Sequence, residues 1–67
     1  MQGVVKWFDP VRGYGFIVGQ DGDDYFVHYT GVDGEGYKML QKDADVEFEI
    51  GESPSGKTMA IEVRGLN

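Results

Sequence analysis

The sequence predicts an all-β protein built as a small closed barrel of five short strands. No segment repeats apolar residues with the 3.6-residue period of an amphipathic helix of useful length. Short runs of alternating apolar residues are separated by turns, and eleven glycines punctuate the chain. Closing such strands into a barrel removes exposed sheet edges, which would otherwise invite aggregation.

The first three strands are expected in the glycine-rich and aromatic first half. The first covers residues 2–9 and ends at Asp9-Pro10, because proline lacks the amide hydrogen that a strand needs. The second and third cover 14–19 and 24–29. The hairpin turn Gln20-Asp21-Gly22-Asp23 joins them, with Gly22 free to adopt a positive φ. Gly15 is expected to let two strands approach closely.

The second half is expected to contribute two more strands after a long loop. Residues 30–44 have no clear period and are interpreted as this loop, with one short 3₁₀ turn. Apolar and polar residues then alternate over 45–50 and 58–64, on either side of a turn at 51–56. The predicted core consists of Val5, Ile17, Val27, Val46, Phe48, Ile50, Ile61 and Val63, with Val32 and Leu40 closing one end.

Length and composition limit the class of protein. With 67 residues, the chain is expected to form one domain over 1–67, and such a domain has a small core. The chain has no cysteine, so no disulfide or thiolate metal site supports it. MQGVVKW does not have the pattern of a signal peptide, and no apolar run approaches membrane-spanning length. We expect a soluble, cytoplasmic protein.

The net charge argues against nucleic-acid binding. Twelve acidic residues against six basic ones give a net charge of −6. Neutralisation of phosphates by Lys and Arg supplies much of the affinity of ordinary nucleic-acid-binding proteins. Composition alone therefore favours a protein partner.

The aromatic residues of the second and third strands point to the opposite conclusion. Alternation collects Ile17, Tyr25 and Val27 on one face, and the other face holds Tyr14, Phe16, Phe26 and His28. These rings could belong to the core or form cross-strand pairs, but the aliphatic face already supplies a core. An apolar patch left in water usually marks a binding surface. Flat exposed rings suit the bases of single-stranded nucleic acid, at about 1–3 kcal/mol per stacked base.

The same residues closely resemble the cold-shock domain. Lys6-Trp7-Phe8, Arg12-Gly13-Tyr14-Gly15-Phe16-Ile17 and Tyr25-Phe26-Val27-His28-Tyr29 match its first strand and its two ring-rich motifs. Gly34-Glu35-Gly36-Tyr37-Lys38 resembles its loop, and Val46-Glu47-Phe48-Glu49-Ile50 its fourth strand. The resemblance spans essentially the whole chain, and two such motifs in order make it specific.

The resemblance implies an antiparallel OB-fold barrel that binds single-stranded RNA and DNA, with a modest pyrimidine preference, and acts as an ATP-independent RNA chaperone. It implies a base-stacking set and a set of contacts to the backbone or to base edges. The stacking set is Trp7, Tyr14, Phe16, Phe26, His28, Tyr29 and Tyr37, and the contact set is Lys6, Arg12, Lys38, Asp9 and Asp24. No cofactor, metal, membrane or small-molecule substrate is expected.

The chain departs from the family pattern in ways that weaken its electrostatic attraction for phosphates. Asp9 replaces a frequent asparagine, Pro10-Val11 replaces a polar pair, and Val4 stands where lysine is common. Three stacking positions carry Tyr rather than Phe. Altered base preference is a further expectation.

Other functions were weighed against the same residues. His28 is the only histidine and has no expected partner nucleophile, so catalysis, including a small nuclease, is not expected. One imidazole and scattered carboxylates do not make a metal site, and the acids at 21, 23 and 24 lack EF-hand spacing. The alternative function is a protein-interaction module that uses the same aromatic patch, which the acidic composition favours.

Overall fold

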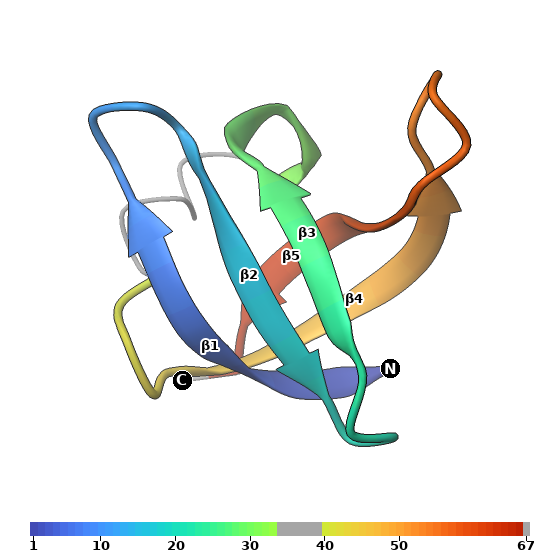
Figure 1. The fold of residues 1–67 in the computed structure, drawn as a ribbon. Coiled ribbons are helices and arrows are strands. Elements are labelled where there is room, and N and C mark those ends of the chain that lie inside the picture. The colour runs from blue at the N-terminus through green and yellow to red at the C-terminus, as the bar shows by residue number, and fades with distance from the viewer. Residues whose placement is uncertain (34–39, 67) are drawn as a thin grey trace.

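The computed structural model describes residues 1–33 and 40–66, and it is built almost entirely from strands (Figure 1). Five strands and one turn of 3₁₀ helix follow one another along the chain. They are β1 (Gln2–Asp9), β2 (Tyr14–Gly19), β3 (Asp24–His28), η1 (Tyr29–Gly31), β4 (Asp45–Glu52) and β5 (Thr58–Gly65). These bounds agree closely with the predicted ranges, and η1 supplies the expected 3₁₀ turn.

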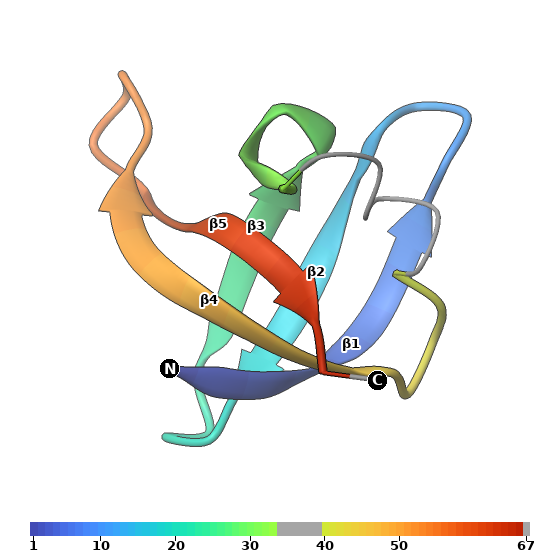
Figure 2. The ribbon, with the colours of Figure 1, turned by 180° about the vertical axis from the view of Figure 1, so that it is seen from behind.

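The strands close into a barrel in the order β1-β2-β3-β5-β4, which confirms the predicted five-stranded barrel of OB type. Figure 1 shows β1, β2 and β3 side by side in one wall with β4 and β5 crossing behind them, and Figure 2 shows the same arrangement from behind, with β4 and β5 in front. Four of the pairings are antiparallel, whereas β3 and β5 run parallel. The curved β1 closes the barrel because it pairs with β2 along most of its length and with β4 at its start.

Gly15 is the point of closest approach between β1 and β2. A Cβ added there would lie 2.2 Å from the carbonyl oxygen of Trp7 and 2.7 Å from the Cα of Phe8. Both contacts are to backbone, so no side-chain rotation would relieve them. The expectation that Gly15 allows close strand approach is confirmed. Gly22 has a φ of +86° in the β2–β3 turn, as the turn was expected to require.

The buried core lies inside the barrel and is mainly aliphatic. Eight predicted core residues are buried, namely Val5, Ile17, Val27, Val32, Leu40, Val46, Phe48 and Val63. Two predictions were wrong: Ile50 is 49% exposed and Ile61 is only partly buried. Ala60 and Tyr25 are buried in addition.

An extra residue in β5 explains why Ile61 is not in the core. Glu47 pairs with Arg64 and Glu49 pairs with Ile61. The chain therefore advances by three residues in β5 over a stretch where it advances by two in β4. Glu62 adopts a φ of +51° at this point. Side chains of a strand alternate between its two faces. One extra residue near Glu62 therefore moves the β5 residues before it to the face opposite the one that the sequence alternation predicts. Ala60 therefore points inward.

Ile50 is exposed because β4 separates from β1 before reaching it. The pairing of β4 with β1 involves only Asp45 to Glu47. Beyond that point β4 is paired with β5 alone, where Ile50 lies opposite Ala60. The strand alternation is as predicted, but the barrel wall that would cover Ile50 is absent at that end.

Tyr25 anchors the β2–β3 turn to the core. Its ring packs 5.3 Å from the ring of Phe48, centroid to centroid, and its hydroxyl donates a hydrogen bond of 2.5 Å to Oδ2 of Asp21. This bond, with burial next, raises the pKa of Tyr25 to about 12. The same bond, helped by the backbone amide of Asp23, lowers the pKa of Asp21.

We predict that Tyr25→Phe makes the free energy of unfolding less dependent on pH in the alkaline range. The folded-state pKa of about 12 lies above the ordinary value of 10.0, so the bond stabilises fully below pH 10. Its contribution is lost as the pH rises through about 12. Urea unfolding at pH 8 and at about pH 11 should show a smaller alkaline loss in Tyr25→Phe than in the wild type. Tyr29→Phe, which removes a hydroxyl from an exposed ring, is the control; equal losses in all three proteins would contradict the assignment.

Candidate nucleic-acid interface

The register of β2 against β3 places four aromatic side chains on the outside of the barrel. Phe16 lies opposite Phe26, and Tyr14 lies opposite His28. All four are half-buried, whereas the intervening residues of both strands are buried in the core. The predicted aromatic face is therefore present on the outer side of β2 and β3.

A bulge in β1 brings Trp7 to the same face. Val5 pairs with Ile17 and Trp7 pairs with Phe16, so Lys6 is an extra residue in β1. Without it, Trp7 would share the inward face of Val5, because side chains two apart point the same way. With it, Lys6 and Trp7 are both exposed, and 39% of the Trp7 surface is open to solvent. We call Trp7, Tyr14, Phe16, Phe26 and His28 the ring face.

The rings of this face touch one another but remain open to solvent. Trp7 lies 5.7 Å from Phe16 and 5.9 Å from Tyr14, measured between ring centroids. Phe26 lies 5.8 Å from Phe16 and 6.0 Å from Tyr14. These separations fall in the range of favourable aromatic pairs, which fix the rings relative to one another. A base that stacks here meets a platform that is already ordered.

Tyr29 extends the ring face at its η1 end. Its ring is 51% exposed and lies 4.6 Å from the His28 ring. Gly13 makes room for it, since a Cβ at Gly13 would lie 2.6 Å from Cδ1 of Tyr29. The His28 ring is oriented by Nδ1, which lies 2.9 Å from Oγ1 of Thr30.

The two described cations beside the ring face are each paired with an acid. Lys6 donates a hydrogen bond of 3.1 Å to Oδ2 of Asp24 across the sheet. Nε of Arg12 lies 3.7 Å from Oδ2 of Asp9, and Nη1 donates to the Tyr14 hydroxyl at 3.3 Å. The Tyr14 hydroxyl, and then the Asp9 charge, raise the pKa of Arg12. These ion pairs reduce the positive electrostatic potential that Lys6 and Arg12 would present to a phosphate.

Asp9 also has a structural task. Its Oδ1 accepts hydrogen bonds from the backbone amides of Val11, at 3.0 Å, and Arg12, at 3.2 Å. It therefore stabilises the β1–β2 turn as an Asx-turn. Tyr37 and Lys38, the remaining predicted contact residues, lie outside the described residues.

The sequence did not indicate a groove that borders the ring face where β3 meets β5. The groove has a volume of about 440 Å³ and combines Phe16, Asp24 and Phe26 with Ser53, Ser55, Lys57, Thr58 and Met59. The extra residue in β5 turns Met59 outward beside Phe26. No periodic signal marks such a bulge, which is why this part of the surface was missed.

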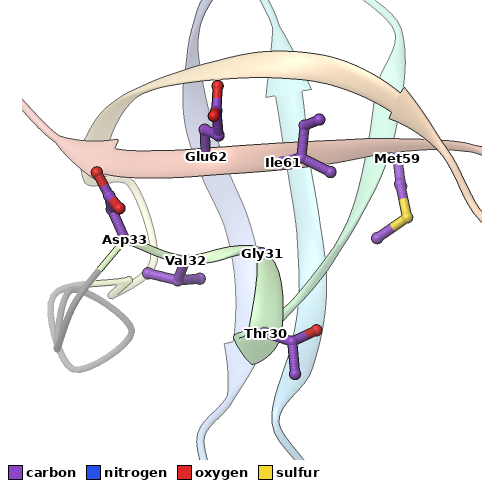
Figure 3. A pocket seen from close by; sticks show the side chains of 7 residues that line it. All are labelled: Thr30, Gly31, Val32, Asp33, Met59, Ile61 and Glu62. Carbon is purple, nitrogen blue, oxygen red and sulfur yellow. The ribbon is translucent and has the colours of Figure 1, made fainter.

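A second pocket, on the other side of Met59, is lined by acidic side chains that would repel a polyanion. Its volume is about 270 Å³, and it lies between η1 and β5 (Figure 3). Asp33 and Glu62 line it together with apolar and small residues, and none of the described residues that line it is basic. Phosphate groups would be repelled there, so the ring face is the better candidate.

Neither a metal centre nor a membrane-spanning helix is found in the part of the chain that the structure describes. No group of three or more His, Cys, Asp or Glu residues there could hold a metal ion. None of the described segments forms a helix with the length and apolar character to cross a bilayer.

Comparison with known proteins agrees with this fold and surface. The family model described as the 'Cold-shock' DNA-binding domain matches residues 1–66. The "Probable cold shock protein A" of Mycobacterium tuberculosis is 52% identical over 66 residues, covering 97% of each chain. The "Cold shock-like protein CspC" of Bacillus cereus is 45% identical over 96% of this chain and 98% of its own. The "Cold shock-like protein" of Thermotoga maritima is 48% identical over 90% and 91%, respectively.

The barrel and its outer rings are those of a nucleic-acid-binding domain. The chain belongs to the cold-shock domain family.

We predict that Asp9→Asn raises the affinity for a single-stranded oligopyrimidine about two- to fivefold at low salt, the range of an exposed ion pair. Asn keeps the Oδ1 that the turn amides require, but it removes the charge that pairs with Arg12. The slope of log affinity against log salt should steepen by about 0.7, one added phosphate contact. Glu49→Gln, an equal charge change on exposed β4, is the matched control. If both variants change affinity equally, net charge rather than the Arg12 pair is responsible.

Proposed function

We propose that the protein binds single-stranded RNA and DNA by stacking unpaired bases on the ring face, and that it acts as an ATP-independent RNA chaperone. The observation that carries the proposal is the gathering of Trp7, Tyr14, Phe16, Phe26 and His28 on one solvent-facing surface. Tyr29 and, outside the described residues, Tyr37 complete the proposed stacking set.

The geometry of the ring face favours single strands over duplexes. The rings lie on adjacent strands and face different directions: Tyr14 and Phe26 are nearly parallel at 29°, whereas Phe16 meets Phe26 edge to face at 76°. A base inside a duplex is stacked between its neighbours and has no free face to offer. An unpaired base can turn its face to a ring, and each such contact contributes about 1–3 kcal/mol.

Stacking also accounts for binding by a chain with a net charge of −6. Lys6, Arg12 and Lys38 are the proposed partners of phosphates or base edges, and Asp9 and Asp24 are proposed to face base edges. Two or three phosphate contacts would give a salt slope of only about −1.4 to −2.1 for a single strand. The affinity then depends mainly on rings, with a modest preference for pyrimidines.

Chaperone action follows from this selectivity by mass action. A marginal hairpin opens and closes spontaneously, and the ring face captures only the open form. Capture lowers the concentration of the free open strand, so more hairpins open until equilibrium is restored. Neither ATP hydrolysis nor any catalytic residue is required. Regulation of transcription or translation by the same melting is part of the proposal, as are a single domain over 1–67 and a cytoplasmic location.

The second candidate is a protein-interaction module that uses the same ring face, and the acidic composition is the observation in its favour. Such a module would bind an apolar or proline-rich segment in preference to a nucleic acid. The experiment that follows separates the two.

Fluorescence of Trp7, the only tryptophan, tests the proposal directly. Three ligands of the same pyrimidine-rich sequence are titrated: a single strand, a weak hairpin and a fully paired stable duplex. The single strand should quench Trp7 most strongly, and the hairpin should bind more weakly by the free energy needed to open it. The duplex should leave the emission unchanged. Quenching by the single strand alone would contradict chaperone action, and no quenching by any ligand would contradict nucleic-acid binding at the ring face.

We predict that Phe16→Ala and Phe26→Ala each weaken single-strand binding by about 1–3 kcal/mol, the contribution of one stacked base. Both rings are half-buried on the outer face, so the barrel should still fold. Ile50→Ala on β4 removes an apolar side chain that is 49% exposed and lies outside the ring face, and it should bind normally. Circular dichroism measures folding for each variant. If either ring variant is unfolded, that ring supports the core rather than a ligand.

A further inference from the structure

A second outer surface, on the wall formed by β4 and β5, combines exposed acids with an apolar side chain. Figures 1 and 2 show this wall behind the one that carries β2 and β3, so its outer side is turned away from the ring face. It contains two pockets, with volumes of about 270 Å³ and 190 Å³. Asp33 and Glu62 line both, which makes the pockets one continuous surface. We call this surface the acidic face; it is formed by Asp33, Glu47, Glu49, Ile61, Glu62 and Arg64.

Ile61 is the apolar part of the acidic face. The extra residue in β5 turns its side chain out of the core, and it is only half-buried. Gly51 leaves room for it on β4, because a Cβ there would lie 2.9 Å from Cδ1 of Ile61. In Figure 3, Ile61 stands between Met59, at one end of the larger pocket, and the acids Glu62 and Asp33, at the other end. An apolar surface therefore lies directly beside two carboxylates.

The smaller pocket gathers four carboxylates around one guanidinium. Its charged residues are Asp33, Glu47, Glu49, Glu62 and Arg64, so four negative charges against one positive leave −3, half of the −6 of the whole chain. A hydrogen bond of 2.6 Å from Nη2 of Arg64 to Oε1 of Glu47 raises the pKa of Arg64, and the charges of Glu47, Asp33 and Glu49 add to this effect. The acidic face thus already accommodates a guanidinium of the chain itself.

Three of these carboxylates are not used by Arg64. Among the described residues, Asp33, Glu49 and Glu62 take part in no salt bridge, whereas Glu47 is paired with Arg64. All three are exposed. A cation from another molecule could pair with them without displacing a described basic side chain.

The charge of the acidic face decides which kind of ligand fits it. A nucleic acid would bring its phosphates against a net charge of −3 and would be repelled. A second copy docked through the same face would bring a further −3, and like charges facing each other across an interface are costly. A basic protein segment instead brings guanidinium groups, which pair with carboxylates through two parallel hydrogen bonds. An apolar residue next to the arginines would cover Ile61.

We propose that the acidic face is a docking surface for a basic segment of a partner protein, in which arginines follow an apolar residue at every second position. The apolar side chain enters the larger pocket against Ile61 and Met59, and the arginines pair with Glu62, Asp33 and Glu49. In an extended segment every second side chain points to the same face, about 6.7 Å from the last. The ring face stays open on the other wall, so the inference does not depend on the proposed function.

Three short capped peptides test the chemistry of the partner by NMR titration of the ¹⁵N-labelled protein. Leu-Thr-Arg-Thr-Arg carries both features, Ser-Thr-Arg-Thr-Arg lacks the apolar residue, and Leu-Thr-Gln-Thr-Gln lacks the charges. The first should bind about three- to tenfold more tightly than the second, and the third should not bind. Amide signals of Asp33, Ile61 and Glu62 should shift, while those of Trp7 and Phe16 stay in place. Equal binding of the first two peptides, or shifts centred on the ring face, would overturn the proposal.

Removal of single carboxylates locates the binding site of Leu-Thr-Arg-Thr-Arg. Glu62→Gln and Asp33→Asn should each weaken its binding about two- to fivefold at low salt, the range of an exposed ion pair. Asp23→Asn is an equal charge change in the exposed β2–β3 turn and should leave the affinity unchanged. If all three variants weaken binding equally, the net charge alone attracts the peptide and the docking surface is rejected.

The contact with Ile61 is tested by changing the protein and the peptide together. Ile61→Thr keeps a β-branched side chain in the strand but makes it smaller and polar. It should weaken the leucine peptide about three- to tenfold and leave the serine peptide unchanged. Ile50→Thr, at a side chain 49% exposed on the other side of β4, is the control and should affect neither peptide. Equal losses for both peptides in Ile61→Thr would contradict the contact. Comparison of the two peptides on the wild type tests the apolar contact even if Ile61→Thr does not fold.

Discussion

The strict alternation of side chains across the paired strands β2 and β3 is the constraint on which this structure depends. Ile17 and Val27 point into the barrel and are fully buried there. Phe16 and Phe26, directly opposite one another, are therefore left on the outer surface. A one-residue slip of this register would bury the rings and expose the aliphatic core. The same pairing that stabilises the barrel thus creates the surface that we propose binds bases.

Two local irregularities shape the surface around this pairing. Lys6 is an extra residue in β1 and moves Trp7 from the inner to the outer side, where it contacts Phe16 and Tyr14. The extra residue near Glu62 in β5 does the same for Met59. Bulges of this kind re-aim side chains while the rest of the sheet keeps its hydrogen bonds. Together they bring Trp7 of β1 into the ring face and place Met59 of β5 beside it.

Ion pairs within the protein limit the positive charge beside the ring face. Asp24 and Asp9 hold Lys6 and Arg12, so the two nearby cations are partly neutralised within the protein. A surface with unpaired cations would attract any polyanion, duplex or single-stranded, through phosphates that both share. Discrimination in favour of unpaired bases is better served when rings supply most of the affinity. The acidic composition, which first argued against nucleic acid, is consistent with this division.

The sequence predicted the strand ranges and the ring-bearing face well. Both follow from the alternation of side chains along a strand, which can be recognised directly in the sequence. It failed at Ile50 and Ile61, since a bulge and the early separation of β4 from β1 depend on long-range pairing. The ion pair between Lys6 and Asp24 joins residues eighteen positions apart and has no local signature. The resemblance to cold-shock domains pointed to Asp9 as a contact residue, but not to its hydrogen bonds within the β1–β2 turn. Tyr37 and Lys38 remain sequence-based predictions.

The most direct measurement of the central claim is an aromatic ¹H–¹³C NMR titration of the labelled protein with an unlabelled single-stranded oligopyrimidine. Ring protons of Trp7, Phe16 and Phe26 should shift upfield together as bases stack over them, and should show intermolecular contacts to base protons. Signals of Phe48, buried in the core, should hardly move. Shifts confined to β4 and the hollow beside Glu62, with the outer rings unchanged, would contradict the account.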